Sequence, residues 1–302
     1  MTYDITITFK PLHEAMSSLH AYICRQSHKK LDLPAAWAAE VKARLEPQFA
    51  ELLDELAINA DWKLTFLLVH LSPAEDASGF AAWLRGQGAG ELYERLAPYC
   101  SQFPKDMAAF RDLTASVFER WEEQYFRSVD REAIVRLGAV CRERRTALAD
   151  ADDLDKYVDE TTNGLRFEPI DGLRELVLIP QMHFQPINVI FHFRRMTICY
   201  YAARIDLRED EFLSAHDFRI IRSLGERSRL KILRFLHGGP RSFIEIVRHL
   251  QLSKGITHDH IGKLRSAGLI HAHFEGETLT VYSLRKGALE RMQAALKAYI
   301  EG

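Results

Sequence analysis

Hydrophobic residues recur at helical spacing through most of the first 150 positions. The segments with this spacing are Pro11–Ile23, Trp37–Leu56 with an interruption at Pro47, Leu64–His70, Ala74–Arg85, Gly90–Leu96, Asp106–Phe126 and Asp130–Ala149. Polar and apolar residues alternate only at Asp4–Phe9, which predicts a short strand. The first half of the chain is therefore predicted to be mainly helical.

The pattern changes after Thr162, where β-branched and aromatic residues form runs separated by Gly and Pro. These runs are Leu173–Ile179, Ile187–Phe193 and Met196–Ala202. They predict two or three adjacent strands, which the strand at Asp4–Phe9 could complete. We therefore expect residues 1–207 to form a mainly helical α+β domain with a small sheet, and the charged segment Asp206–Glu211 to link it to a second domain at 208–302.

The second domain has a more specific pattern. It begins with an apolar stripe in Phe218–Phe235, continues with a helix that Ser242 and Glu245 can cap, and has a short turn at Gln251–Ser253. A helix at Lys254–Ala267 follows, and then two strands, Leu269–Phe274 and Leu279–Leu284. This order is the winged form of the helix-turn-helix.

The helix at Lys254–Ala267 is the one expected to meet DNA. Its periodicity turns three residues inward, namely Ile256, Ile261 and Leu264. It turns five residues outward, namely Lys254, Thr257, His258, Lys263 and Arg265. A short turn before such a helix lets its exposed first half enter the major groove.

Charge is unevenly distributed along the 302 residues, whose net charge is only −2. Residues 211–302 hold 15 Lys and Arg against 9 Asp and Glu, a balance of +6, so residues 1–210 carry −8. A basic end on an acidic body favours a polyanionic partner. The N-terminus lacks the basic start and apolar run of a secretion signal, and no apolar run reaches about 20 residues, so we expect a cytoplasmic protein with no membrane partner.

The C-terminal stretch resembles the ArsR-type family of bacterial repressors. Four segments carry the resemblance: Leu224–Leu233 (LGERSRLKIL), Leu252–Ser253 (LS), His258–Ile270 (HDHIGKLRSAGLI) and Val281–Leu284 (VYSL). The resemblance implies a homodimeric DNA-binding regulator, most simply a repressor, with the last helix as the dimer element. Residues 1–207 resemble, more loosely, the N-terminal extension that some such regulators carry.

Carried over by position, the base-reading residues of the family fall on Lys254, Gly255, Ile256, His258 and Asp259, with His260 beside them. With the groups expected to hold phosphates, the predicted DNA-binding set is Arg241, Ser253, Lys254, Gly255, Ile256, Thr257, His258, Asp259, His260 and Lys263. Two departures weaken phosphate binding. Asp259 stands where a basic residue is common, and Glu275 and Glu277 replace the usual arginines of the wing.

Metal sensing by the usual sites of the family is not expected. Residues 242–247 contain no cysteine, and the last helix, Gly287–Ile300, lacks the Asp and His pairs of the alternative site. His271 and His273 face the same side of a strand but lack a third ligand, so we interpret them as solvated or DNA-facing. We predict no metal and no cofactor.

Catalysis is not expected either, because no catalytic residue could be assigned. His183 and His192 lie on predicted strands without a nucleophile or carboxylate at diagnostic spacing. Cys141 lies among Arg142, Arg144 and Arg145, which could lower its pKa and make it reactive toward oxidants.

The sequence therefore predicts a regulator that binds double-stranded operator DNA, is not an enzyme and does not depend on metal. Its domain at 1–207 would dimerise or sense an unknown small-molecule effector. The alternative is that this domain is an enzyme or a protein-interaction module, and that the winged helix serves in dimerisation.

Overall fold

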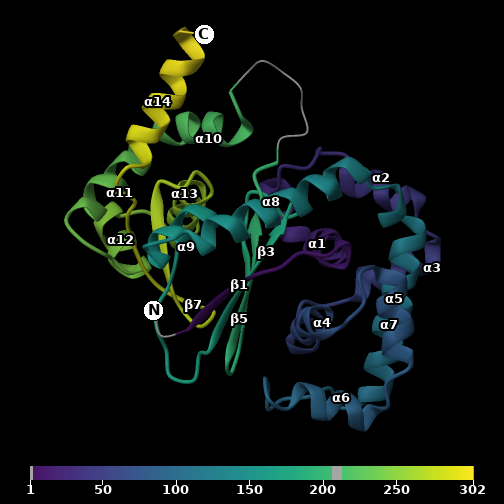
Figure 1. Ribbon diagram of the computed structural model, residues 1–302. Coiled ribbons are helices and arrows are strands. Elements are labelled where there is room, and N and C mark those ends of the chain that lie inside the picture. Colours follow the sequence, from purple (N-terminus) through teal and green to yellow (C-terminus); the bar gives the residue numbers. More distant parts are fainter. Residues whose placement is uncertain (1–2, 206–212, 302) are drawn as a thin grey trace. The chain divides into compact units, whose positions relative to one another are not determined.

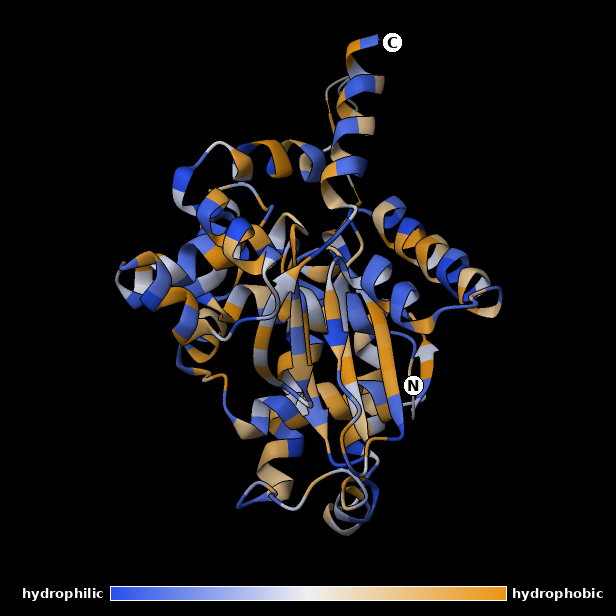
Figure 2. Cartoon of the chain, turned by 90° about the vertical axis from the view of Figure 1, so that its left-hand side faces the viewer, coloured by the Kyte–Doolittle hydropathy of each residue, from blue (hydrophilic) through white to orange (hydrophobic). Residues whose placement is uncertain are grey.

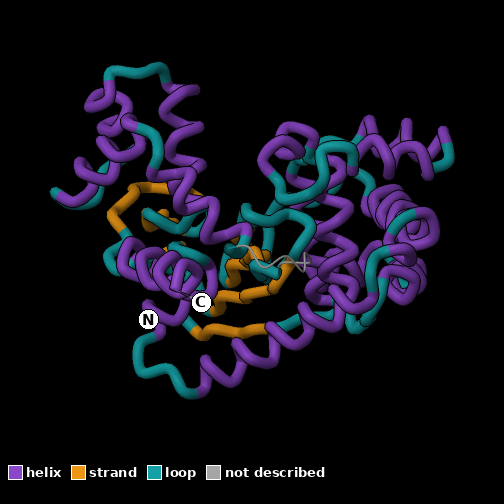
Figure 3. The backbone as a smooth tube through the Cα atoms, turned by 90° about the horizontal axis from the view of Figure 1, so that it is seen from above, coloured by secondary structure: helices purple, strands orange, loops and turns teal. Residues whose placement is uncertain are grey.

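The structure is a computed structural model that describes residues 3–205 and 213–301. The chain divides into two compact units, and helices make up most of the backbone of both (Figures 1 and 3). The N-terminal unit comprises Tyr3–Arg145 and Gly172–Ile205. The C-terminal unit comprises Thr146–Asp171 and the described residues after 212. The predicted fold class, mainly helical α+β with a C-terminal winged helix-turn-helix, is confirmed.

The N-terminal unit contains a four-stranded sheet in the order β1-β3-β5-β4. Its strands are β1 (Asp4–Ile7), β3 (Glu175–Gln181), β4 (Val189–Phe193) and β5 (Met196–Ala202). The pairs β1–β3 and β3–β5 are parallel, and only β4 runs antiparallel to β5. All seven residues of β5 are buried. This burial explains its unbroken apolar sequence, because a strand covered on both faces needs no polar alternation.

Helices cover this sheet and form the rest of the N-terminal core. They are α1 (Pro11–Ile23), α2 (Trp37–Arg44), α3 (Pro47–Glu55), α4 (Ala60–Leu71), α5 (Ala77–Arg85), α6 (Ala89–Leu96), α7 (Met107–Gln124) and α8 (Arg131–Ala149), with 3-10 turns at Arg25–Lys30 and Phe126–Ser128. The helix predicted over Trp37–Leu56 is two helices, because Pro47 begins α3. Helix α1 is buried from Leu12 to Ile23, although it includes His13, Glu14 and His20.

The C-terminal unit combines the predicted winged helix with a segment that we did not assign to it. Its elements are α9 (Leu154–Thr162), β2 (Leu165–Phe167), α10 (Ala215–Leu224), α11 (Arg227–His237), α12 (Phe243–Leu250), α13 (Lys254–Ser266), β6 (Ile270–Glu275), β7 (Thr278–Leu284) and α14 (Ala288–Glu301). Hydrophobic and hydrophilic residues alternate in bands along α14 (Figure 2).

Strand β2 pairs in parallel with β6, so the hairpin β6–β7 is part of a three-stranded sheet. The structure thus differs from the predicted division into 1–207 and 208–302, because Thr146–Asp171 groups with the C-terminal residues. The pairing of Leu165 with Ala272 joins positions too far apart for a local pattern to reveal. The predicted linker at Asp206–Glu211 and the boundary itself lie outside the described residues.

Candidate nucleic-acid interface

The predicted helix-turn-helix is present with well-formed caps. The Ser242 amide donates to Glu245 Oε2 over 2.8 Å, and the Glu245 amide donates back to Ser242 Oγ over 3.3 Å. The hydrogen bonds that the Ser242 amide and hydroxyl donate to the carboxylate lower the pKa of Glu245, so this carboxylate stays ionised at the positive end of the helix. Ser253 caps α13 by accepting from the Ile256 amide. The caps fix where α12 and α13 begin, as the sequence predicts.

The first two turns of α13 present an exposed surface. Among the predicted residues, Ser253, Lys254, Gly255, Ile256, His258, Asp259 and Lys263 are all exposed. Ile256 is 50% exposed, so the periodicity that turned it inward is wrong, and its position agrees with the base-reading role carried over from the family. A Cβ built on Gly255 would meet no atom within 4 Å, so the backbone there is open to a ligand.

Two residues expected to face outward on α13 do not. Thr257 is completely buried, so its prediction as a DNA contact is wrong. Arg265 lies with its guanidinium 5.7 Å from the centre of the Phe274 ring and hydrogen-bonds Tyr282, and burial lowers its pKa. Both errors have one cause, because the helix is rotated so that Ile256 faces solvent and Thr257 faces the core.

His260 and Arg241 are predicted contacts that the structure ties to other groups. His260 is half-buried, and its Nδ1 lies 3.6 Å from Glu226 Oε2 at the start of α11. The backbone of Arg241 exchanges two hydrogen bonds of 2.8 Å with that of Tyr282. The Arg241 guanidinium packs over the Phe235 ring at 4.9 Å. Its direct role on DNA stays a prediction, while its anchoring role is visible.

Asp259, the unusual acid on this surface, is paired within its own helix. Lys263 Nζ lies 2.7 Å from Asp259 Oδ2, one turn further along. Both side chains are about half exposed, so the pair is screened by water and contributes little to stability. The ion pair matters for DNA binding instead, because each charged group reduces the electrostatic field that the other presents to DNA.

The wing is the hairpin of β6 and β7, and it turns at Gly276, whose φ of +64° suits glycine. Glu275 and Glu277 are exposed beside this turn, as predicted. The third strand, β2, lies along β6 and pairs Arg166 with His273. The other long edge of the hairpin belongs to β7, where the backbone of Arg241 bridges Tyr282.

The wing histidines are neither solvated nor available to DNA, which corrects our interpretation. His271 Nε2 lies 2.9 Å from Asp159 Oδ1, and His273 Nδ1 lies 2.8 Å from Glu168 Oε1. Both imidazoles are largely buried, with 12% and 16% of their side chains exposed. Their acidic partners come from the segment after α8, so these contacts tie that segment to the wing.

A buried arginine completes this attachment. Arg285 Nε donates to Asp159 Oδ1 over 3.0 Å, and its Nη1 donates to Asn163 Oδ1 over 2.9 Å and to the Gly268 carbonyl over 3.1 Å. Gly268 has a φ of +64°, and a Cβ there would collide with the side chains of Asn163 and Arg285. Its glycine is therefore required by the backbone and by the close approach of these side chains.

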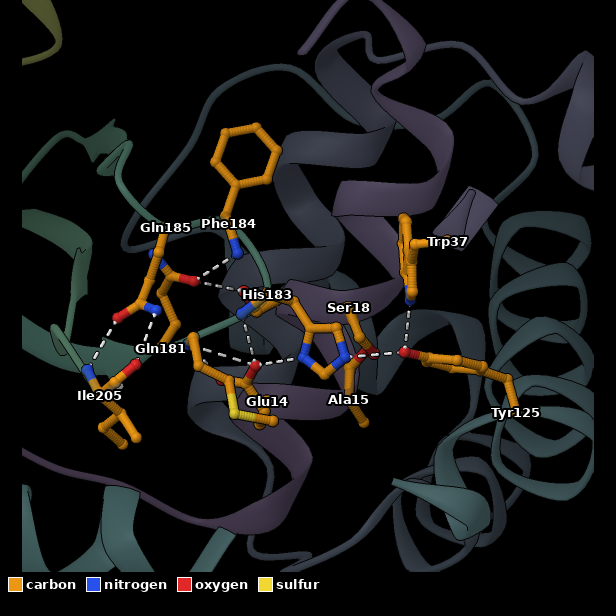
Figure 4. A network of polar contacts seen from close by, with 12 residues as sticks. Glu14, Ala15, Ser18, Trp37, Tyr125, Gln181, His183, Phe184, Gln185 and Ile205 are labelled. Atoms are coloured by element: carbon orange, nitrogen blue, oxygen red, sulfur yellow. Dashed lines mark hydrogen bonds and ion pairs between the residues drawn. The ribbon is translucent and has the colours of Figure 1, made fainter. Parts of the chain in front are cut away.

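A second polar network lies inside the N-terminal unit (Figure 4). His183 Nδ1 lies 2.6 Å from Glu14 Oε1, and His183 Nε2 lies 2.8 Å from the Tyr125 hydroxyl, to which Trp37 Nε1 donates over 2.9 Å. Glu14 also accepts from the amides of Met182 and His183. The sequence revealed no carboxylate partner for His183, because 169 residues separate it from Glu14.

This network resembles an acid–base–hydroxyl relay, but its burial favours a structural role. Glu14 and His183 are 0% and 4% exposed. Burial also raises the pKa of Tyr125 to about 12, so its hydroxyl keeps its proton. With the Nδ1 proton of His183 directed to Glu14, Nε2 accepts from Tyr125. The network thus fastens the segment at 181–186 to α1 and α7.

Other candidate chemistry finds no support. Burial raises the pKa of the Cys141 thiol despite the neighbouring Arg145, so the proposed activation of this cysteine is wrong. Nowhere in residues 3–205 and 213–301 do three or more His, Cys, Asp or Glu side chains gather as metal ligands would. Among the same residues, every helix is too short or too polar to cross a bilayer.

A family model matches the part of the chain that carries this surface. Residues 226–272, from the cap of α11 to the first half of β6, match the model of the bacterial regulatory proteins of the arsR family. Neither the comparison with curated proteins nor that with solved structures finds a match. At residues 226–272 the chain thus carries an arsR-type helix-turn-helix domain, preceded by a long N-terminal extension.

Proposed function

We propose that the protein is a cytoplasmic transcription regulator that binds double-stranded operator DNA through the first turns of α13. One observation carries this proposal. Lys254, Gly255, Ile256 and His258 are exposed together at the capped start of the helix that follows the turn, inside the segment that matches the arsR family. A helix placed in this way can enter the major groove with its N-terminal residues on the base edges.

Selection of bound fragments from genomic DNA, followed by titration of the selected site at several salt concentrations, tests the proposal. We expect a preferred sequence and an affinity that falls as salt rises, because each neutralised phosphate releases counterions. Binding with neither sequence preference nor salt dependence would refute it. The full chain should be used, because a fragment of residues 208–302 would lack β2 and Asp159.

Substitutions at Lys254 and Asp259 should change DNA affinity in opposite directions. Lys254→Gln removes an exposed cation and should weaken binding across sequences and reduce the salt slope by about 1. Asp259→Asn removes a carboxylate and releases Lys263, so it should strengthen binding and steepen the slope. Fluorescence anisotropy with labelled operator measures both effects, with Lys297→Gln on α14 as the control. Equal affinities for the two variants would contradict the assigned surface.

We further propose that the regulator acts as a homodimer through α14. Leu289, Tyr299 and Ile300 are 44%, 44% and 71% exposed, whereas Met292 and Leu296 on the same predicted face are half-buried. Exposed apolar side chains on one helix favour burial against a second copy. Two copies would present two recognition helices to half-sites about 34–36 Å apart.

The dimer proposal predicts that Ile300→Glu shifts the protein toward a monomer, because it places a charge in the apolar contact. Analytical ultracentrifugation over a range of concentrations measures the shift, and Lys297→Glu serves as the control on the same helix. A wild-type chain that stays monomeric at all concentrations, or an Ile300→Glu variant that dimerises as tightly as wild type, would contradict it.

Repression, metal independence and a role in binding rather than catalysis belong to the same proposal. Repression is supported by the resemblance to repressors, and metal independence by the absence of cysteine from residues 242–247. The buried, fully bonded state of the Glu14–His183–Tyr125 network supports a non-catalytic role. The N-terminal unit would then serve effector sensing or dimerisation.

The acidic wing favours a second candidate function. Glu275 and Glu277 are exposed where phosphate contacts are expected, and Asp259 adds a third carboxylate. A winged helix with this charge could serve as a dimerisation or protein-interaction module of a chain whose N-terminal unit carries the activity. Failure of the full chain to bind any selected DNA would favour this candidate.

A further inference from the structure

The C-terminal unit contains a pocket of about 620 Å³ away from the exposed turns of α13. Its walls come from α9, from β2, from the wing strands, from the turn between α11 and α12, and from the start of α14. The volume lies in the range of small-molecule sites in proteins, about 300–1,000 Å³. Five separate chain segments therefore surround a space that can hold a small molecule.

Four cationic side chains line this pocket, namely Lys156, Arg166, Lys286 and Arg291. None of the four has a carboxylate within ion-pair distance among the residues that the structure describes. Cations that lack a local partner attract an anion into a concave, partly desolvated site. His237 also lines the pocket and is exposed.

The acidic groups of the pocket are largely engaged. Asp159 is held by Arg285 at 3.0 Å and by His271 at 2.9 Å. Asp153 caps α9 by accepting from the Lys156 amide. Glu160 lies close enough to Arg285 to favour the charged form of that arginine. The lining therefore sets four cations against these three carboxylates, which leaves one net positive charge in the pocket.

The two wing histidines form the floor together with Ser283. Ser283 Oγ lies 3.2 Å from His271 Nδ1 and 2.9 Å from His273 Nε2. Each histidine is also bonded through its other nitrogen to a carboxylate, His271 to Asp159 and His273 to Glu168. The result is a continuous chain, Asp159–His271–Ser283–His273–Glu168, across the wing.

Counting the hydrogens shows which protonation state this series of hydrogen bonds requires. A nitrogen bonded to a carboxylate must carry a hydrogen, so a neutral histidine has only a lone pair left for Ser283. Ser283 has one hydrogen and can donate to only one of the two histidines. All four hydrogen bonds form only when the other histidine is an imidazolium. One added proton therefore completes the network, and with Arg285 it balances the charges of Asp159 and Glu168.

We propose that this pocket is the effector site of the regulator and binds a small molecule that carries a phosphate or sulfate group. The four cations approach from three segments, as suits a tetrahedral oxyanion that accepts from several directions. As an effector site, the pocket rests on the proposed function; as an anion site, it stands on its own geometry.

An occupant of the pocket would act directly on the parts that meet DNA and the partner copy. Lys286 and Arg291 lie at the start of α14, and His271 and Ser283 face each other across the wing. Binding that draws these groups together biases the wing and α14 at once. Because an effector shifts an equilibrium only by its difference in affinity for two states, the site predicts a change in operator affinity.

Titration of the full chain with inorganic sulfate, by isothermal calorimetry, tests the site without DNA. Sulfate is chosen because its charge does not change between pH 6 and 8. We expect saturable binding of one sulfate per chain, and the double variant Lys286→Gln/Arg291→Gln should bind roughly tenfold or more weakly. Lys297→Gln, which removes a cation of α14 outside the pocket, should leave the affinity unchanged. Equal losses in the double variant and in Lys297→Gln would overturn the proposal.

DNA is the other source of phosphate, and a competition experiment separates the two. Sulfate binding that persists when operator DNA is bound supports a site for a free small molecule. If DNA displaces sulfate, and the double variant loses operator affinity as well, the pocket is a contact for the DNA backbone and the effector proposal is overturned. The sulfate titration without DNA does not depend on operator binding. Failure of the regulator proposal can therefore be distinguished from failure of the anion-site proposal.

Discussion

Arg285→Met is expected to lower the free energy of unfolding of the C-terminal unit by about 3–5 kcal/mol. Arg285 is 6% exposed, and its removal leaves the carboxylate of Asp159, itself 8% exposed, without its cation. Breaking one partner of a buried ion pair costs this much because the remaining charge stays desolvated. Methionine keeps most of the apolar length of the side chain, so the loss reports on the charge and its hydrogen bonds.

Hydrogen exchange of the amides in α9, β2 and β6 measures this effect, since these elements meet at Arg285 and Asp159. Lys263→Met is the matched control in the same unit. It breaks an ion pair whose side chains are 54% and 51% exposed, and it should cost less than about 1 kcal/mol. Similar losses for the two variants would show that Arg285 does not fasten the segment after α8 to the wing.

Acid should destabilise the N-terminal unit well before its carboxylates titrate. Burial lowers the pKa of His20 to about 4, and burial lowers that of His13 well below 6.5. In the unfolded chain both histidines take up a proton near pH 6.5. Their contribution to the free energy of unfolding is therefore complete above that pH. It falls by about 1.4 kcal/mol per pH unit for each histidine as the pH drops toward the folded value. At pH 5 the loss from His20 alone should be about 2 kcal/mol, and His13 adds to it.

Urea denaturation at pH 7 and pH 5, followed by the fluorescence of the tryptophans, measures this loss. His20→Gln should remove the part of the stability loss that comes from protonation of His20, because glutamine does not titrate in this range. His237→Gln replaces an exposed histidine of the C-terminal unit and should leave the loss in the N-terminal unit unchanged. A stability that stays constant from pH 7 to pH 5 would contradict the buried, neutral state of His13 and His20.

The elements of the helix-turn-helix were predictable because their signals are local. Ser242 and Glu245 lie three residues apart, and each satisfies the other's backbone, so a cap can be recognised from the sequence. Gly268 and Gly276 adopt positive φ where helix and hairpin must turn. Apolar spacing likewise predicted most of the N-terminal helices and the strands of the four-stranded sheet. The family resemblance rested on these same local features.

The buried face of α13 was harder to predict from the sequence, because the helix has apolar residues on more than one side. Ile256, Thr257 and Ile261 allow two rotations, and hydrophobicity favoured burial of Ile256. The structure buries Thr257 instead and leaves Ile256 50% exposed. The proposed function would explain this departure, since an exposed isoleucine on a helix in the major groove can contact the thymine methyl group.

By itself, the sequence determined the mainly helical class, the winged helix-turn-helix, its caps and its acidic wing, because each depends on residues within one or two turns of one another. Only the tertiary structure decided that β2 and α9 join the wing, that Asp159 and Glu168 hold His271 and His273, and that Glu14 holds His183. These contacts join residues 105 to 169 positions apart, and no periodicity reaches that far. Burial decided the state of these side chains, because the same imidazole or carboxylate is solvated on a surface and paired inside a core.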